Sequence, residues 1–386
     1  MNKVLIVGSD HHNTLGIIES LAQRGIKPYV IVYTHDKKPY LRYSKNYTRL
    51  WVCDSEMKII SCMLDNFCDD QNKAIVISSA DEVSVFLDKH FEQLINHFYL
   101  PISSRYGQLE DIMSKQFMAD LAQNVGLTVP RTWMTTDKTI PADIEYPCIT
   151  KAVSSIAGAK DNTAICQDET DLKHFLNDMP HCNTIIIQKF IEKEFEFQLL
   201  GCSFNDGNEI VISGRTNIDR PNGIENTFFL SFDKCESELD ELISKAKLFI
   251  KETKYNGPFS VEFLKGKDGV NYFTEMNFRN DGNAYCQTAA GINIPYLMYL
   301  YYSGGDYRQE LSESDVHKVF LMPEISYTKC LLRGEFGIKE WWRNMKKADC
   351  FTTYFKNDSR LFYRCAYIQI REIIKNKTGR FLNKLR

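Results

Sequence analysis

Four polar residues in the second half of the chain are of the types that bind a divalent cation beside a phosphate group. Glu262 lies within an alternating apolar run. Glu275 lies near the end of the next such run, and Asn277 and Arg279 follow directly after that run. Carboxylate and amide oxygens suit Mg²⁺, which takes hard ligands and leaves room for phosphate oxygens. An arginine beside them can stabilise charge that develops on a transferred phosphoryl group, so the set indicates phosphoryl-transfer chemistry.

A β-hairpin must position these residues. Residues 257–276 alternate between apolar and polar side chains on both sides of a turn at residues 266–269, which contains Asp-Gly. Alternation with a period of two predicts strands, and the turn predicts that they are antiparallel neighbours. We therefore expect Glu262 and Glu275 to converge from adjacent strands. A surface hairpin with solvated carboxylates is the alternative.

The hairpin resembles the metal-binding end of the ATP-grasp fold, where a strand glutamate precedes a Glu-x-Asn-x-Arg sequence. Residues 283–295 (NAYCQTAAGINIP) are also similar to carboxylate–amine ligases of the D-aspartate ligase and carbamoyl-phosphate-synthase-like groups. The resemblance implies an α/β protein with a parallel-sheet domain at residues 1–112 and a two-lobed ATP-grasp domain at residues 113–305. It also implies ATP and Mg²⁺ as cofactors, with Mn²⁺ as the alternative metal. Residues 306–386, which the resemblance does not explain, are expected to form a mainly helical, basic extension.

Segments before the hairpin match the family in the expected order. A lysine on the helix expected over residues 109–125 precedes Gly-Leu-x-x-Pro, so the resemblance implies that Lys115 contacts phosphate. Lys151 ends a β-run and would hold phosphate during catalysis. The small-residue loop after it would close over the phosphates through exposed backbone N–H groups. Its candidate residues are Ser154, Ser155 and Gly158. A solvated lysine and a flexible polar turn are the alternatives for these two segments.

The strand expected over residues 184–191 would run into the hinge where adenine binds. The resemblance assigns the nucleotide contacts there to Gln188, Lys189, Phe190 and Ile191. Glu196 has the spacing for ribose, while Gln188 departs from the family's usual glutamate and leaves the nucleotide preference open. Arg215 is a catalytic candidate, because arginine can hold a carboxylate or a phosphoryl group with two hydrogen bonds. A plain sheet strand and a surface arginine are the alternatives.

The chain opens with a strand–helix–strand unit. Residues 3–8 and 28–33 are apolar runs typical of buried parallel strands, and residues 14–24 carry an apolar helical face. The turn GSDHHN lacks the second and third glycines of a dinucleotide site, which argues against a dehydrogenase. Loops at the carboxyl ends of parallel strands bind ligands, so we expect substrate contacts from His11, His12, Asn13, Asp81 and Glu82. Helix capping by Asn13 or Asp81, and solvated histidines, are the alternatives.

Composition is that of an ordinary globular protein, with 44% apolar and 25% charged residues in 386. Twelve cysteines without a C-x-x-C pair indicate reduced thiols, and no signal peptide or membrane span is evident. We therefore expect a cytoplasmic protein that does not bind nucleic acid. Residues 339–386 hold thirteen Lys and Arg against four Asp and Glu. This basic end could lie on an anionic membrane, but packing of Trp341 and Trp342 on the core is the favoured interpretation.

Together these segments predict an ATP-dependent carboxylate–amine ligase whose partners are small-molecule carboxylates and amines. A substrate carboxylate would attack the γ-phosphorus of ATP to give an acyl phosphate, and an amine would then displace phosphate. The products would be an amide or peptide, ADP and phosphate. Within ligases the closest resemblance is to amino-acid ligases of cell-wall or surface-polymer metabolism. A carbamoyl-phosphate-like or small-peptide-forming enzyme is the alternative, as is a non-catalytic ATP-binding regulator. The sequence names neither substrate and leaves the oligomeric state open.

Overall fold

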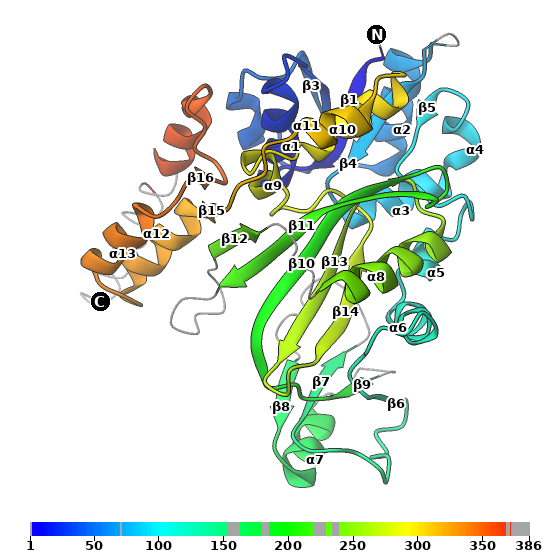
Figure 1. Cartoon of the computed structure of the whole chain (residues 1–386), viewed down its shortest axis with the longest axis vertical. Coiled ribbons are helices and arrows are strands. Elements are labelled where there is room, and N and C mark those ends of the chain that lie inside the picture. The colour runs from blue at the N-terminus through cyan, green and yellow to red at the C-terminus, as the bar shows by residue number, and fades with distance from the viewer. Residues whose placement is uncertain are drawn as a thin grey trace, which may run out of the picture.

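Three β-sheets organise the part of the chain that the computed structural model describes, which is residues 2–69, 72–152, 163–178, 185–219, 229–233, 239–367 and 371. Figure 1 shows a parallel sheet at the top, a long twisted sheet in the middle and a small sheet at the lower end. This mixture of sheets and helices confirms the predicted α/β class. The bounds of the three predicted domains stay predictions.

A five-stranded parallel sheet forms the N-terminal part. Its strands are Val4–Ser9 (β1), Tyr29–Tyr33 (β2), Arg49–Cys53 (β3), Ala74–Ser78 (β4) and Phe98–Tyr99 (β5). Its helices are His12–Ala22 (α1), the 3-10 turn Tyr40–Tyr43 (η1), Glu56–Phe67 (α2), Asp81–Lys89 (α3) and Phe91–Leu94 (α4). The strand order is β3-β2-β1-β4-β5, and alternate residues of β1 enter different hydrophobic clusters on the two faces. From β1 the chain continues toward β2 and from β4 toward β5, so the order reverses between them, where such sheets bind ligands.

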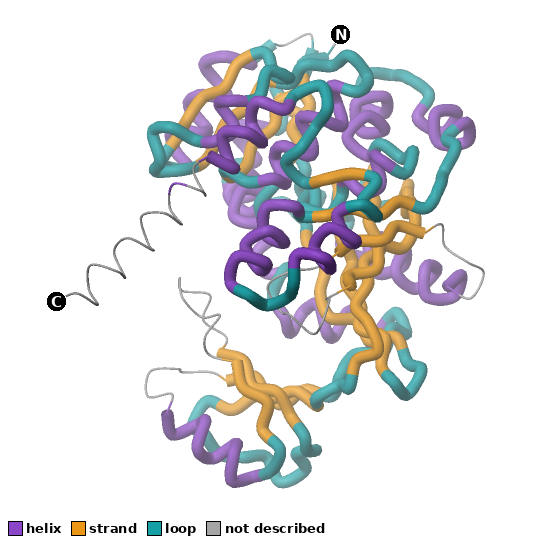
Figure 2. Tube along the Cα trace, turned by 90° about the vertical axis from the view of Figure 1, so that its left-hand side faces the viewer, coloured by secondary structure: helices purple, strands orange, loops and turns teal. Residues whose placement is uncertain are grey.

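The small sheet has four strands and one helix on it. Its strands are Thr132–Thr135 (β6), Cys148–Ala152 (β7), Thr163–Cys166 (β8) and Ile185–Lys189 (β9), and the helix is Glu169–Asp178 (α7). The order is β6-β9-β7-β8, with antiparallel neighbours throughout. Trp133, Leu172 and Ile187 belong to its own buried cluster. Figure 2 shows this sheet and helix together at the lower end of the molecule, as a separate lobe.

The large sheet has seven strands and carries the predicted hairpin. Its strands are Lys193–Phe204 (β10), Glu209–Asp219 (β11), Phe229–Asp233 (β12), Gly257–Gly266 (β13), Asn271–Asn277 (β14), Val319–Met322 (β15) and Cys350–Phe351 (β16). They lie in the order β14-β13-β10-β11-β12-β15-β16. Asp240–Thr253 (α8) packs on one face with two helices that precede β6, which are Leu109–Ile112 (α5) and Lys115–Asn124 (α6). The other face shares a cluster with α1 and the later helices Tyr285–Ala289 (α9), Ile294–Tyr302 (α10) and Tyr307–Glu313 (α11).

The single helix expected over residues 109–125 is two helices in the structure. Ser114 has an extended backbone (φ −64°, ψ 140°), and its hydroxyl accepts a hydrogen bond of 3.3 Å from the backbone N–H of Phe117. Ser114 is therefore the N-cap of α6, a position that serine favours because its oxygen satisfies a free N–H group. Lys115 is consequently the first residue of a helix, where the expectation placed it inside one.

The predicted extension at residues 306–386 is mainly helical in its described part, but it also completes the large sheet through β15 and β16. Besides α11, it contains the helices Glu324–Arg333 (α12) and Ile338–Met345 (α13) and a helical stretch over residues 359–367. The buried Glu324 carboxylate accepts backbone N–H bonds from Thr352, Thr353 and Tyr354, which ties the segment after β16 to α12. None of the helices that the structure describes has the length and apolar character that a bilayer crossing requires.

Candidate active site

Glu262 and Glu275 lie directly opposite each other on the antiparallel strands β13 and β14. Phe259, Val261 and Phe263 point to the other face of β13, where all three are buried. Their burial holds the register, because a slip of one residue would turn the apolar side chains toward solvent. The structure thus confirms that the hairpin brings the two carboxylates together.

The Glu262 carboxylate is held by two amides. Gln198 on β10 and Asn277 on β14 donate side-chain hydrogen bonds of 2.8 and 3.0 Å to the same oxygen, Oε1. Asn283 in turn donates to Gln198 at 2.9 Å. Burial, together with the negative charges of Glu275 and Asp281, raises the pKa of Glu262 to about 8, against the opposing effects of the Gln198 hydrogen bond and of Arg279. The amides fix the carboxylate, while its neighbours leave an excess of negative charge.

This arrangement fits a divalent cation. Glu262 and Glu275 supply carboxylate oxygens, Asn277 supplies an amide oxygen, and like charges directly opposite in a sheet destabilise it unless a cation lies between them. In the described part of the chain no three His, Cys, Asp or Glu side chains are grouped to hold a metal. The amide of Asn277 is therefore an essential member of the proposed set. Only two carboxylates would bind, which leaves positions for phosphate oxygens and water, as Mg²⁺ requires.

Arg279 joins the hairpin to the N-terminal sheet. Its Nε donates to Oδ2 of Asp81 at 3.0 Å, and its Nη1 donates to Oδ2 of Asp281 at 2.9 Å. The guanidinium also approaches the Oδ1 atom of Asn277 at 3.4 Å. Asp81 lies in the first turn of α3 and does not cap it through its side chain, so the capping alternative is wrong. Two carboxylates orient the arginine beside the proposed metal ligands.

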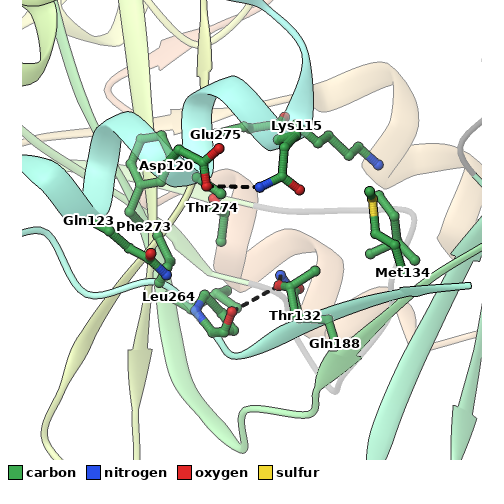
Figure 3. Close-up of a pocket in the computed structure, with 15 residues that line it drawn as sticks. Lys115, Asp120, Gln123, Thr132, Met134, Gln188, Leu264, Phe273, Thr274 and Glu275 are labelled. Carbon is green, nitrogen blue, oxygen red and sulfur yellow. Dashed lines mark hydrogen bonds between the residues drawn. The ribbon is translucent and has the colours of Figure 1, made fainter. Parts of the chain in front are cut away.

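A cavity of about 320 Å³ lies between α6, the small sheet and the hairpin. Figure 3 shows that it brings together Lys115 from α6, Gln188 from β9 and Glu275 from β14, which are candidates for three different roles. The side chain of Gln188 donates to the Thr132 hydroxyl at 3.1 Å. Val129, Met134, Ile186, Leu264 and Phe273 supply apolar wall. Apolar walls with a few polar groups are typical of sites for a planar ligand such as a base.

The structure does not bring the other hinge candidates into this cavity. Lys189 and Phe190 donate their backbone N–H groups to carbonyls of Arg131 and Pro147, at 2.8 and 3.0 Å. The Lys189 ammonium pairs with Glu145 at 2.8 Å, and Ile191 does not line the cavity. Glu196 is half-buried on β10 and pairs with Lys193. Binding of adenine by N–H groups of Lys189 or Phe190 would require these bonds to break.

Five further candidates either lie outside the cavity or fall wholly or partly outside the described residues. Lys151 lies in β7 opposite Ile186 of β9, but its side chain lies outside the described residues. Ser154, Ser155 and Gly158 lie outside them altogether. Arg215 on β11 lies outside the cavity, with its guanidinium 5.7 Å from the ring centre of Phe195. Its Nε is buried and has no hydrogen-bond partner among the described residues, so Arg215 could still receive an anion.

A second cavity, of about 470 Å³, lies where the order of the parallel strands reverses, between β1 and β4. All five substrate candidates from the N-terminal sheet line it, together with Arg279, Asp281 and Asn283. Burial lowers the pKa of His12 to about 3, helped by the adjacent His11, so His12 is neutral at physiological pH. The pKa of His11 is also lowered, chiefly by burial and then by Arg279.

Two of these five residues, His11 and Asn13, use their polar atoms in hydrogen bonds within the protein. His11 is the N-cap of α1, since its Nδ1 accepts from the backbone N–H of Asn13 at 3.3 Å. Asn13 does not cap. Its buried amide donates to the carbonyls of Ser79 and Asn280, at 2.6 and 2.5 Å, and so bridges the N-terminal sheet to the segment after β14. His12 and Glu82 are the members that these bonds leave uncommitted.

Sequence reasoning missed Gln198, Asp281 and Asn283. A signal existed for Gln198, because it is a single polar residue in a run of apolar ones on β10. Asp281 and Asn283 follow Arg279 at intervals of two residues, which continues the alternation of the metal set. The contact of Asp281 with Arg279 is local, whereas the bond from Asn283 to Gln198 comes from folding across the sheet and carries no local signal.

This chain is similar to one family of known proteins and to several solved structures. Residues 112–299 match the family model of the ATP-binding domain of the carbamoyl-phosphate synthase L chain. A comparison with curated protein sequences gives no significant match. Among solved structures, an L-amino acid ligase from Bacillus licheniformis is 17% identical with a TM-score of 0.63, covering 83% of this chain and 79% of the ligase.

Two further structures share the fold. The N5-carboxyaminoimidazole synthetase from Staphylococcus aureus is 15% identical with a TM-score of 0.64, covering 87% of this chain and 88% of that one. The biotin carboxylase domain of 2-oxoglutarate carboxylase from Hydrogenobacter thermophilus, in complex with the magnesium salt of ADP and with bicarbonate, is 15% identical with a TM-score of 0.63. That match covers 83% of this chain and 74% of the carboxylase domain.

Proposed function

We propose that the chain is an ATP-grasp protein and an ATP-dependent carboxylate–amine ligase, because residues 112–299 match the model of an ATP-binding domain and solved structures of ligases and synthetases share its fold. One observation carries the proposal. The cavity that holds Lys115, Gln188 and Glu275 meets the paired glutamates, and Arg279 links these to a second cavity at the N-terminal sheet. The proposed sites for nucleotide, cation and substrate would thus follow one another along the molecule.

The nucleotide would occupy the first cavity, with its base against the apolar wall near Gln188. Lys115 supplies a positive charge at the start of α6, where the helix N-terminus also favours anions, and Lys151 is proposed to supply a second. Glu262, Glu275 and Asn277 would hold Mg²⁺. The ion, when bound, supplies positive charge that offsets the charge of the nucleotide phosphates.

The carboxylate and the amine would occupy the second cavity. A carboxylate oxygen attacks the γ-phosphorus of ATP, the bond to the β-γ bridging oxygen breaks, and ADP leaves. The amine nitrogen then attacks the acyl carbon, loses a proton and displaces inorganic phosphate. Arg279 lies between the proposed metal ligands and this cavity, which supports a role for its guanidinium in stabilising the transferred phosphoryl group. The protein contributes mainly by orienting the reactants.

The substrates that the second cavity suits best are amino acids. Its wall carries Asp281 and Glu82, which favour an ammonium group, while Arg279 favours the carboxylate of the same molecule. We therefore propose a cytoplasmic amino-acid ligase. The resemblance of residues 283–295 to D-aspartate-ligase-like proteins supports a role in cell-wall or surface-polymer metabolism. Bicarbonate as the carboxylate, with a carbamoyl-phosphate-like product, is the second candidate, because bicarbonate is bound in one structural neighbour.

Release of ADP from ATP tests the proposal. The purified protein is given Mg²⁺ and ATP with amino acids singly and in pairs, and in parallel with bicarbonate and ammonia. A ligase gives ADP release that requires both a carboxylate and an amine, together with an amide product seen by mass spectrometry. Release with bicarbonate and ammonia alone selects the carbamoyl-phosphate-like activity. Nucleotide binding without turnover in every combination would identify a regulator and refute the ligase.

A further inference from the structure

The outer edge of α13 is apolar and exposed. Ile338 is 62% and Trp342 is 56% exposed, and they lie four residues apart, on one side of the helix. The neighbouring part of the same apolar stripe, Trp341 and Met345, packs against the buried pair Met322 and Tyr327. The indole N–H of Trp341 also donates to the Thr328 hydroxyl at 3.1 Å. The packing interpretation is therefore right for Trp341 and wrong for Trp342.

Four cations lie on α13 and its C-terminal end. Lys339, Arg343, Lys346 and Lys347 form no ion pair with any residue that the structure describes, and the Nζ atom of Lys346 lies 5.2 Å from the centre of the Trp342 ring. Leu332, near the end of α12, which packs beside α13, is another large apolar side chain and is 53% exposed. Lysine and arginine beside an exposed tryptophan are typical of helices that lie in a membrane interface.

Within the described part of the chain, the position of α13 leaves this edge accessible. Figure 1 shows α12 and α13 at the margin of the molecule, across the large sheet from α6 and the nucleotide cavity. A flat surface could therefore meet α13 without covering the cavity. Exposed apolar side chains beside cations suit a lipid headgroup region, which accommodates both kinds of group, better than the rigid face of a folded protein.

We propose that α13 attaches the protein to an anionic membrane surface, with Ile338 and Trp342 entering the headgroup region and the four cations meeting lipid phosphates. The net positive charge of the last residues of the chain argues against their binding to this edge of α13. Residues 372–386 contain five Lys and Arg against one Glu, so they carry the same sign as α13 and add to its attraction for an anionic surface. This attachment does not depend on which reaction the enzyme catalyses.

Sedimentation with lipid vesicles tests the attachment. The full chain is mixed with vesicles of phosphatidylcholine alone, and of equimolar phosphatidylcholine and phosphatidylglycerol, at low and high ionic strength. We expect binding to the anionic vesicles only, and its loss at high ionic strength. The pair Lys339→Glu and Lys346→Glu should weaken binding by about tenfold or more, since each cation near such a surface contributes to the attraction. The pair Ile338→Ser and Trp342→Ser should also weaken it.

Helix α8 offers a matched control. Lys247 and Leu248 are an adjacent cation and an apolar residue, and Leu248 is 51% exposed, on a helix at the opposite margin. The pair Lys247→Glu and Leu248→Ser should leave vesicle binding unchanged. Equal effects of the α8 and α13 pairs, or no binding of the full chain to anionic vesicles, would overturn the proposal. The proposal would also be overturned if the full chain did not bind anionic vesicles but was retained on an immobilised acidic protein. Circular dichroism and thermal midpoints verify that each variant is folded.

Discussion

Asp81 and Arg279 are 198 residues apart in sequence and joined by a hydrogen bond of 3.0 Å between Oδ2 and Nε. The bond connects the first turn of α3 to the segment that follows β14. Because the arginine side chain is only 19% exposed, the interaction is better shielded from solvent than a surface ion pair. The orientation of the proposed phosphoryl-stabilising group therefore depends on a carboxylate from the N-terminal sheet.

Replacement of Asp81 by asparagine should lower turnover more than nucleotide affinity. The variant keeps the size of the side chain but loses the charge that orients the guanidinium of Arg279. We expect kcat to fall by about tenfold to a hundredfold, which corresponds to the loss of a charge-assisted hydrogen bond, with the KM for ATP little changed. The measurement is steady-state ADP release. Asp54→Asn, which removes one partner of the surface pair with Lys58, is the control, and equal effects would contradict the assignment.

Replacement of Glu275 by glutamine should abolish ADP release while leaving the fold intact. The change preserves volume and removes a charge that the proposed cation needs, so turnover should fall by on the order of a hundredfold or more. Mg²⁺ with ADP should raise the thermal midpoint of the natural protein and not that of the variant. Glu241→Gln, at an exposed site on α8, should behave like the natural protein. Turnover of the Glu275 variant at the natural rate would remove it from the metal site.

Removal of either proposed phosphate-binding lysine should weaken nucleotide binding. Lys115 lines the nucleotide cavity, so Lys115→Ala should raise the Kd for ADP by about tenfold, the scale of one charge-assisted hydrogen bond. We expect Lys151→Ala to have the larger effect, since Lys151 lies on a strand and Lys115 on the first turn of a helix. Titration calorimetry measures both, with Lys247→Ala as the control. Normal ADP binding by both variants would refute the proposed phosphate site.

Stability should fall as the pH rises through the range in which Glu19 titrates. Burial raises the pKa of Glu19 from 4.5 to about 7, against the opposing hydrogen bonds from Asn46, and the charge of Asp358 adds to the increase. Between these values the folded state keeps a proton that the unfolded state loses. The free energy of unfolding therefore decreases with rising pH, by about 3 kcal/mol from this group.

The Glu19→Gln variant isolates that contribution. Glutamine stays neutral and keeps an oxygen for Asn46, so the variant should be more stable than the natural protein at about pH 8 and similar to it at about pH 4.5. Urea unfolding at both pH values measures the difference, in which the contributions of other titrating groups cancel. A difference between the two proteins that is the same at both pH values would show that Glu19 does not titrate in this range.

The sequence by itself determined the elements whose signals are local. Alternation around an Asp-Gly turn fixes the hairpin, and it correctly predicted that Glu262 and Glu275 face each other. Apolar runs fix the parallel strands, and the positions after them correctly marked the residues that line the second cavity. These signals work because side-chain period and turn chemistry act over a few residues.

Only the tertiary structure decided which of these elements meet. The pairing of Arg279 with Asp81, and of Gln198 with Glu262 and Asn283, depends on how β10, β13 and the N-terminal sheet lie against one another. The strands β15 and β16 likewise join the large sheet although they follow its hairpin by some forty residues or more. Such contacts leave no periodic trace in the chain, because their energy comes from burial and charge across segments that are adjacent only after folding. The local pattern thus fixed the metal-binding hairpin, while long-range packing decided the setting of Arg279.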